Sequence, residues 1–227
     1  PEASCRECNK LTSAFEHTCL RTMYGPLRLL YDLPSKRRKK RPRTLPLKIK
    51  RTAKDDWSYT DVEQEKYPFL VLFPYLSMPK MLSKGIDLTY RGAATDRFWI
   101  RGASPSYVFK ELLEQLVREL GVYSIMPEAK AQVNEFCQML AKIAHAFAVA
   151  ELGVDSFRPF LIPYIVRSDL SDCDKFIGGR EKDEVLSSEL HELSLISGPD
   201  HEFVVVRIRL LARLGTPTYF LVVGATL

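Results

Sequence analysis

Three stretches of the chain place apolar residues at the spacing of an amphipathic helix. They are residues 7–24, 104–120 and 127–153, and a glycine or proline bounds each of them. An apolar stripe that returns every three to four residues buries one face of a helix, and Pro127 stands where proline commonly starts one. The pattern therefore predicts one helix near the N-terminus and two long helices farther along the chain.

Elsewhere apolar and polar residues alternate, or short apolar runs are bounded by turn residues, as is typical of strands. Pro74 is expected to end one of these strands, and the Gly-Gly pair within FIGGREKDE (176–184) is expected to form a turn. Strands on both sides of two long helices favour an α+β fold with an antiparallel sheet. The predicted strands are residues 45–51, 69–76, 86–92, 96–102, 189–197, 201–214 and 217–227.

Charge is distributed unevenly along the chain. The net charge is +5, but residues 36–54 hold 11 of the 33 Lys and Arg residues and no acid, which leaves 22 basic against 28 acidic residues elsewhere. This contrast divides the chain into an N-terminal segment (1–34), an extended basic arm or linker (35–66) and an α+β domain (67–227).

The basic arm predicts a nucleic-acid partner. Clustered ammonium and guanidinium groups bind phosphates mainly by releasing counterions, and prolines within the arm keep it extended along a groove or backbone. A solvated linker is the alternative interpretation of the same residues. We predict DNA contacts from Lys36, Arg37, Arg38, Lys39, Lys40, Arg41, Arg43, Lys48, Lys50 and Arg51.

Cysteine is concentrated at the start of the chain, where Cys5 and Cys8 form a C-x2-C pair. Two thiolates at this spacing bind one tetrahedral zinc ion, but they supply only half of its four ligands. His17 and Cys19 could complete the set only if the helix were broken, because Cys8 and Cys19 lie about 16 Å apart along a continuous helix. Two ordinary thiols are the third possibility.

CRECNKLTSAFE, which begins at Cys5, resembles the second half of the zinc-bearing HNH (His-Me finger, ββα-metal) nuclease motif. In that family a C-x2-C followed by Asn or His opens the last helix of the motif. The resemblance implies a structural zinc ion at Cys5 and Cys8, and a catalytic role for Asn9 in holding Mg²⁺ or a similar ion. It covers about the first 20 residues, and a looser likeness to bacterial HNH-like proteins extends further.

The same resemblance implies a histidine general base ahead of Cys5, which the chain does not contain. We therefore expect residues upstream of Pro1 to complete the site, and the 227-residue chain to be inactive alone. Two functions follow as expectations. The chain is the DNA-binding C-terminal portion of an HNH-like endonuclease, or it is a non-catalytic α+β module that binds nucleic acid or protein, including a second copy of itself.

The remaining sequence names no other chemistry. It has no nucleotide-binding glycine loop and no serine-nucleophile motif, and its apolar runs are too short to span a bilayer. The short apolar runs favour no membrane partner, and the odd cysteine count favours a reducing cytoplasm. Asp169, Asp172 and Asp174 are interpreted as a polar loop rather than a metal site, and His145 as a surface or interface histidine.

Overall fold

The structure of the chain, a computed structural model, describes residues 6–25, 27, 42–83, 98–103, 109–166, 170, 172–180, 186–198 and 201–227, and for residues 98–103 it describes the backbone alone. It contains helices and antiparallel sheets, which confirms the predicted α+β class. Several predictions lie outside the described residues, among them the strand at 86–92, the helix start at 104–108 and Asp169.

The chain divides into two units, and it enters each of them more than once. Unit 1 comprises residues 1–19, 73–101 and 132–227, and unit 2 comprises residues 20–72 and 102–131. These limits differ from the sequence-based division at residues 34 and 66. Composition marks where the basic arm begins, but it carries no information on which distant segments return to the same core.

Unit 1 is built on a five-stranded antiparallel sheet in the order β6-β10-β9-β8, with β7 also paired to β10. β8 and β9 pair from His191 opposite Leu210 to Ile196 opposite Val205. The last two strands of the chain are the longest in this sheet, as their apolar runs predicted. The strands are β6 (Phe157–Pro159), β7 (Ile177–Gly179), β8 (His191–Ile196), β9 (Phe203–Leu210) and β10 (Tyr219–Thr226).

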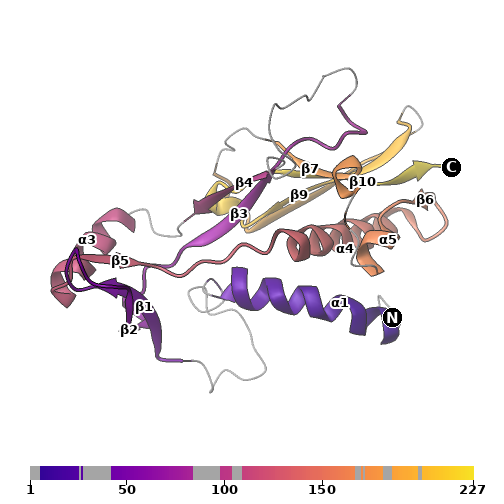
Figure 1. Cartoon of the computed structure of the whole chain (residues 1–227). Coiled ribbons are helices and arrows are strands. Elements are labelled where there is room, and N and C mark those ends of the chain that lie inside the picture. Colours follow the sequence, from indigo (N-terminus) through magenta and orange to yellow (C-terminus); the bar gives the residue numbers. More distant parts are fainter. Residues whose placement is uncertain are drawn as a thin grey trace. The chain divides into compact units, whose positions relative to one another are not determined.

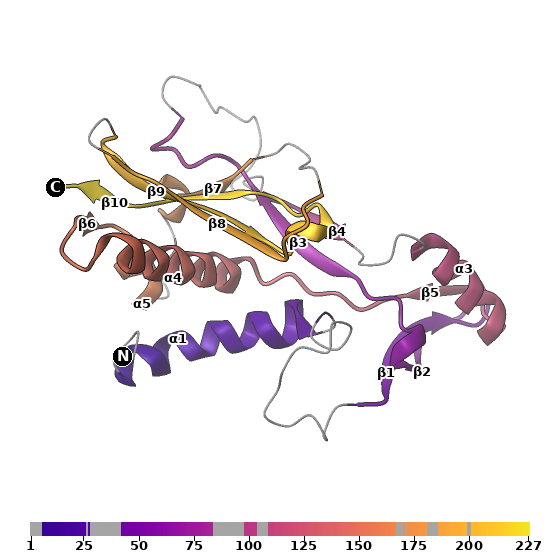
Figure 2. The ribbon, with the colours of Figure 1, turned by 180° about the vertical axis from the view of Figure 1, so that it is seen from behind.

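Helix α4 lies along one face of β9 and β10, and α1 packs beside α4 (Figures 1 and 2). Phe136 of α4 meets Tyr219 of β10 edge to face, with ring centroids 5.2 Å apart. Both side chains are buried, as are the small residues of α4 that allow this close approach. The helical elements of unit 1 are α1 (Arg6–Thr18), α4 (Val133–Leu152), α5 (Ile162–Val166), η4 (Cys173–Lys175) and η5 (Ala212–Leu214), while η1 (Cys19–Met23) follows α1 directly.

Helix α4 begins later than the sequence pattern indicated. The predicted helix started at Pro127, whereas α4 starts at Val133 after the short strand β5 (Ser124–Met126). Residues 127–131 belong to unit 2, where the backbone N–H of Glu128 donates to the Tyr67 hydroxyl at 3.4 Å. Tertiary contacts therefore hold this segment extended and override its helical propensity.

Strand β3 (Val71–Leu76) pairs with β4 (Phe98–Ala103), and it continues through Pro74, where we expected it to end. Proline lacks an N–H donor, but a two-stranded sheet leaves one side of each strand unpaired, so the loss is tolerated. The Pro74 carbonyl accepts a hydrogen bond of 2.8 Å from the buried Tyr219 hydroxyl. Pro74 is thus a fixed point of unit 1 rather than a strand terminus.

The Gly-Gly pair of residues 178 and 179 lies in strand β7, not in the turn that the sequence suggested. The Gly179 N–H donates to the Ser77 carbonyl at 3.0 Å, and a Cβ at Gly178 would stand 2.2 Å from that same oxygen. Glycine is required here because another backbone segment approaches too closely for any side chain.

An ion pair joins α1 to α4. The Lys142 ammonium lies 2.5 Å from Glu16 Oε1 and donates a hydrogen bond of 2.8 Å to Thr12 Oγ1. The side chains of Lys142 and Glu16 are only 25% and 32% exposed, so solvent screens this pair less than it screens a surface pair. The pair holds the helix that carries Cys8 and Asn9.

Replacing Lys142 with Met is expected to lower the free energy of unfolding by about 1–3 kcal/mol, because Glu16 and Thr12 lose a partly buried partner. Urea unfolding followed by circular dichroism measures the change. Lys110→Met is the control, since Lys110 pairs with Glu114 at 4.0 Å while 85% exposed, and its loss should leave stability nearly unchanged. Equal effects of the two variants would contradict a stabilising role for the α1–α4 pair.

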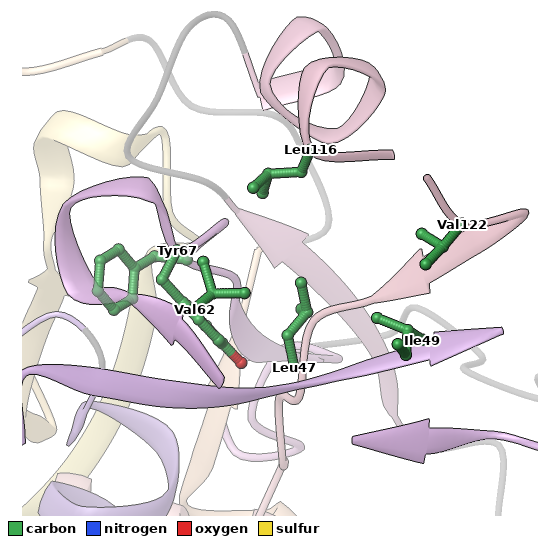
Figure 3. Packing of buried hydrophobic residues seen from close by; sticks show 7 residues of the cluster. Leu47, Ile49, Val62, Tyr67, Leu116 and Val122 are labelled. Carbon is green, nitrogen blue, oxygen red and sulfur yellow. The ribbon is translucent and has the colours of Figure 1, made fainter. Parts of the chain in front are cut away.

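Unit 2 consists of a three-stranded antiparallel sheet, in the order β2-β1-β5, and a helix. Leu47 and Ile49 of β1 lie on the side of the strand that faces Leu116, and Val62, Tyr67 and Val122 join them (Figure 3). The predicted strand at 45–51 and the Gly121 stop of the second predicted helix are confirmed. The elements are β1 (Thr44–Lys50), β2 (Ser58–Glu63), η3 (Gln64–Lys66), α3 (Phe109–Leu120) and β5.

Candidate nucleic-acid interface

Strand β1 separates a buried face from a basic face. Leu47 and Ile49 are buried in the core of unit 2, while Lys48 and Lys50, which alternate with them, extend from the opposite face of the sheet. Two of the predicted DNA-binding lysines are therefore presented side by side on a rigid strand. Their positions follow directly from the Leu-Lys-Ile-Lys alternation.

Two aromatic rings stand beside these lysines. Tyr59 of β2 pairs with Lys48 across the sheet, and the Lys48 ammonium lies 5.6 Å from the centroid of the Tyr59 ring. The Lys50 ammonium lies 5.3 Å from the centroid of the Trp57 ring. Trp57 is 41% exposed and Tyr59 is 56% exposed, which is unusual for such large rings. We call Lys48, Lys50, Trp57 and Tyr59 the basic–aromatic face.

Glu128 fixes one end of the basic–aromatic face. Its carboxylate accepts a hydrogen bond of 2.8 Å from the Tyr59 hydroxyl and lies 3.4 Å from the Lys48 ammonium. The Tyr59 hydrogen bond, more than the nearby lysine, holds the pKa of Glu128 below its ordinary value. The interaction with Tyr59, followed by that with Glu128, raises the pKa of Lys48. Lys48 thus stays charged and the Tyr59 ring is held in place.

Other predicted DNA-binding residues lead into this face. Arg43 immediately precedes β1, and its carbonyl accepts a hydrogen bond of 2.9 Å from the Gln64 N–H, which anchors the end of the arm to the sheet. Arg51 follows β1 and is exposed. Residues 36–41 lie outside the described part of the chain, so their contacts remain predictions.

The positive charge of the chain belongs to unit 2. Its segments contain 17 Lys and Arg and 10 Asp and Glu residues, a balance of +7, whereas unit 1 contains 16 basic and 18 acidic residues, a balance of −2. The two values add up to the net charge of +5. An anionic partner is therefore attracted to unit 2 rather than to the larger sheet of unit 1.

Of the predicted metal and catalytic residues, Cys8 and Asn9 lie at the start of α1. Cys8 is partly exposed and Asn9 is exposed, one after the other in the first turns of the helix. Cys5 lies outside the described residues, so the C-x2-C pair stays a prediction. Where the structure describes side chains, no group of three or more His, Cys, Asp and Glu residues could hold a metal ion.

The alternative zinc set of Cys8, His17 and Cys19 does not assemble. Helix α1 is continuous from Arg6 to Thr18, and His17 is exposed while Cys19 is fully buried. Burial, with the nearby carboxylate of Glu135, raises the pKa of the Cys19 thiol to about 12, so a thiolate ligand is disfavoured there. Burial raises the pKa of the Cys137 thiol as well.

The acidic loop and His145 make contacts within unit 1. Asp172 pairs with Lys175 at 3.0 Å and Asp174 pairs with Lys80 at 2.7 Å, as expected of a polar loop rather than of a cation site. His145 packs edge to face on Phe157, and burial lowers its pKa. It is therefore half-buried inside unit 1, where the sequence indicated a surface or interface position.

Trp57 and Tyr59 are not among the residues that the sequence predicted for this interface. The signal was present, because Trp-Ser-Tyr-Thr-Asp alternates large and small residues just after the polar Lys-Asp-Asp segment. What the sequence could not show is that this strand pairs with β1 so that the rings meet Lys48 and Lys50. The register sets Leu47 opposite Thr60 and Ile49 opposite Ser58, and it leaves Leu47 and Ile49 buried in the core of unit 2.

The fold and the site together describe an α+β protein with an exposed basic–aromatic sheet face. The chain matches no protein-family model, no curated protein and no solved structure. None of the described helices combines the length and the apolar composition that crossing a bilayer demands.

Proposed function

We propose that this chain binds nucleic acid through unit 2, using the basic arm and the basic–aromatic face of its small sheet. The observation that carries the proposal is the pairing of Lys48 and Lys50 with two exposed aromatic rings, on the unit that holds the whole positive excess of the chain. Lysines contribute attraction to phosphates, and exposed rings contribute stacking to bases.

Fluorescence anisotropy with labelled DNA tests this function. Binding driven by phosphates should weaken along a straight line when the logarithm of the affinity is plotted against the logarithm of the salt concentration. Equal affinity at low and high NaCl, or no binding at either, would refute the proposal.

Metal-dependent phosphodiester cleavage is a second candidate function, and it rests on the resemblance to HNH nucleases. What favours it is that Cys8 and Asn9 are adjacent at the accessible start of α1. A thiolate and an amide oxygen are donor types that suit zinc and Mg²⁺, respectively, but the described residues nearby do not complete either ligand set. Mg²⁺-dependent nicking of supercoiled plasmid by the natural full-length protein, abolished by Asn9→Ala, would support this candidate. A full-length protein that leaves the plasmid intact with Mg²⁺ would favour the non-catalytic module.

A further inference from the structure

We infer that the basic–aromatic face is a stacking platform for a single-stranded nucleic acid, rather than a contact surface for duplex DNA alone. The inference rests on the proposed function and specifies its ligand. It comes from the way in which Trp57 and Tyr59 are presented, each with a lysine ammonium within 6 Å of the ring centroid.

The spacing of the two rings suits an extended strand. Trp57 immediately precedes β2 and Tyr59 is its second residue. Residues two apart at strand spacing lie on one face at a separation of about 6.6 Å. This is about twice the ~3.4 Å rise per nucleotide of a stacked strand. Two neighbouring bases that are unstacked from each other can therefore each cover one ring, and so can every second base of a stacked nucleic-acid strand. The lysine ammonium that lies over each ring, within 6 Å of its centroid, supplies a positive charge near a base stacked there.

A duplex cannot use these rings in the same way. Its base faces are covered by neighbouring base pairs, whereas every unpaired base offers a π-face to an aromatic side chain. The rings are also supported from beneath, because the buried side of the same sheet packs on Leu116 and its neighbours (Figure 3). A rigid support of this kind reduces the ordering cost of binding.

Acidic residues limit the platform at its ends. Asp61 lies two residues after Tyr59 in β2, on the same face of the strand and opposite Pro46 of β1. Asp55 and Asp56 precede Trp57. The Asp55 carboxylate accepts a hydrogen bond of 2.9 Å from the Thr52 N–H, which fixes the turn between the two strands. Carboxylates repel phosphates. The bound nucleic-acid strand is therefore expected to cross the two rings with its phosphate backbone on the side of Lys48 and Lys50.

The experiment compares a short fluorescein-labelled oligothymidylate, an oligouridylate of the same length and a hairpin duplex, at one fixed salt concentration. Trp57→Ala and Tyr59→Ala are each expected to weaken binding of the single strands by about 5- to 100-fold and binding of the duplex by less than about twofold. Trp57→Phe should restore most of the affinity, because a ring is retained. The oligouridylate shows whether the platform distinguishes RNA from DNA.

Tyr123→Ala is the matched control. Tyr123 is exposed in the same unit, but it lies one residue before β5, and the alternation gives it the parity of Ile125, which is partly buried against the core of unit 2. The Tyr123→Ala substitution should leave the affinity for single strands unchanged. Two outcomes would overturn the stacking platform while preserving the proposed function. In the first, Trp57→Ala and Tyr59→Ala leave salt-dependent binding intact. In the second, they weaken the binding of single strands and of the duplex equally. If no probe is bound, both ideas fail.

Discussion

Raising NaCl from about 50 to about 200 mM is expected to weaken nucleic-acid binding by about 10³-fold or more. The arm and β1 offer ten basic residues to phosphates, from Lys36 to Arg51. If six or more of them displace counterions, the logarithm of the affinity falls with a slope of about −5 against the logarithm of the salt concentration for a duplex. Anisotropy titrations across this salt range measure the slope. A slope near zero would contradict the phosphate-driven account.

Two double variants with the same change in charge test whether the salt dependence of binding arises from unit 2. Lys50→Gln combined with Arg51→Gln should make the slope shallower by about 1.4 for a single strand and about 1.8 for a duplex. Arg158→Gln combined with Arg180→Gln removes two charges from exposed positions of unit 1 and should leave the slope unchanged. If both pairs lowered the slope equally, the interface would not be confined to unit 2.

Gly178→Ala is expected to destabilise unit 1 by about 3–5 kcal/mol. The new methyl group would stand 2.2 Å from the Ser77 carbonyl oxygen and 2.4 Å from the Pro79 nitrogen, both of which are backbone atoms that cannot rotate away. Strand β7 would have to separate from residues 77–79 and give up the hydrogen bond from Gly179 to Ser77. A fall in Tm of about 10 °C in a thermal melt followed by circular dichroism is the expected reading.

Gly25→Ala serves as the control for this substitution. A Cβ at Gly25 would have its nearest neighbour, the Leu20 carbonyl oxygen, at 3.8 Å, which is ordinary van der Waals contact. Its effect on Tm should be small in either direction. A Gly178→Ala protein with the same Tm as the unsubstituted chain would show that the close approach of residues 77–79 to β7 is absent in solution.

Local pattern was sufficient to predict helices α1, α3 and α4 and the longer strands, but not β2, β5, β6, β7 or α5. The alternation in Leu-Pro-Leu-Lys-Ile-Lys marked β1, and the terminal apolar runs marked β9 and β10, because each of these strands has one or two faces buried by its own unit. The failures occur where distant backbone decides the conformation. Pro127 opens no helix because Glu128 is held by Tyr59, Lys48 and Tyr67 in unit 2.

The candidate site was only partly predictable for the same reason. Lys48, Lys50 and Arg51 could be recognised from charge alone, since charge clustering is a property of the sequence itself. Their partnership with Trp57 and Tyr59 depends on the register of β1 and β2, which only the folded sheet defines. Cys8 and Asn9 illustrate the opposite case. Their motif consists of neighbouring residues and can be recognised in the sequence, whereas any ligands that complete it are not sequence neighbours.

The central claim is that the basic–aromatic face of unit 2 contacts nucleic acid. Ultraviolet cross-linking of the full chain to an oligothymidylate, followed by proteolysis and mass spectrometry of the cross-linked peptides, tests it most directly. We predict that the dominant cross-linked peptide contains Trp57 and Tyr59 and that competing unlabelled oligonucleotide removes the signal. Cross-links confined to unit 1, for example to α1 or to β8, would contradict the claim.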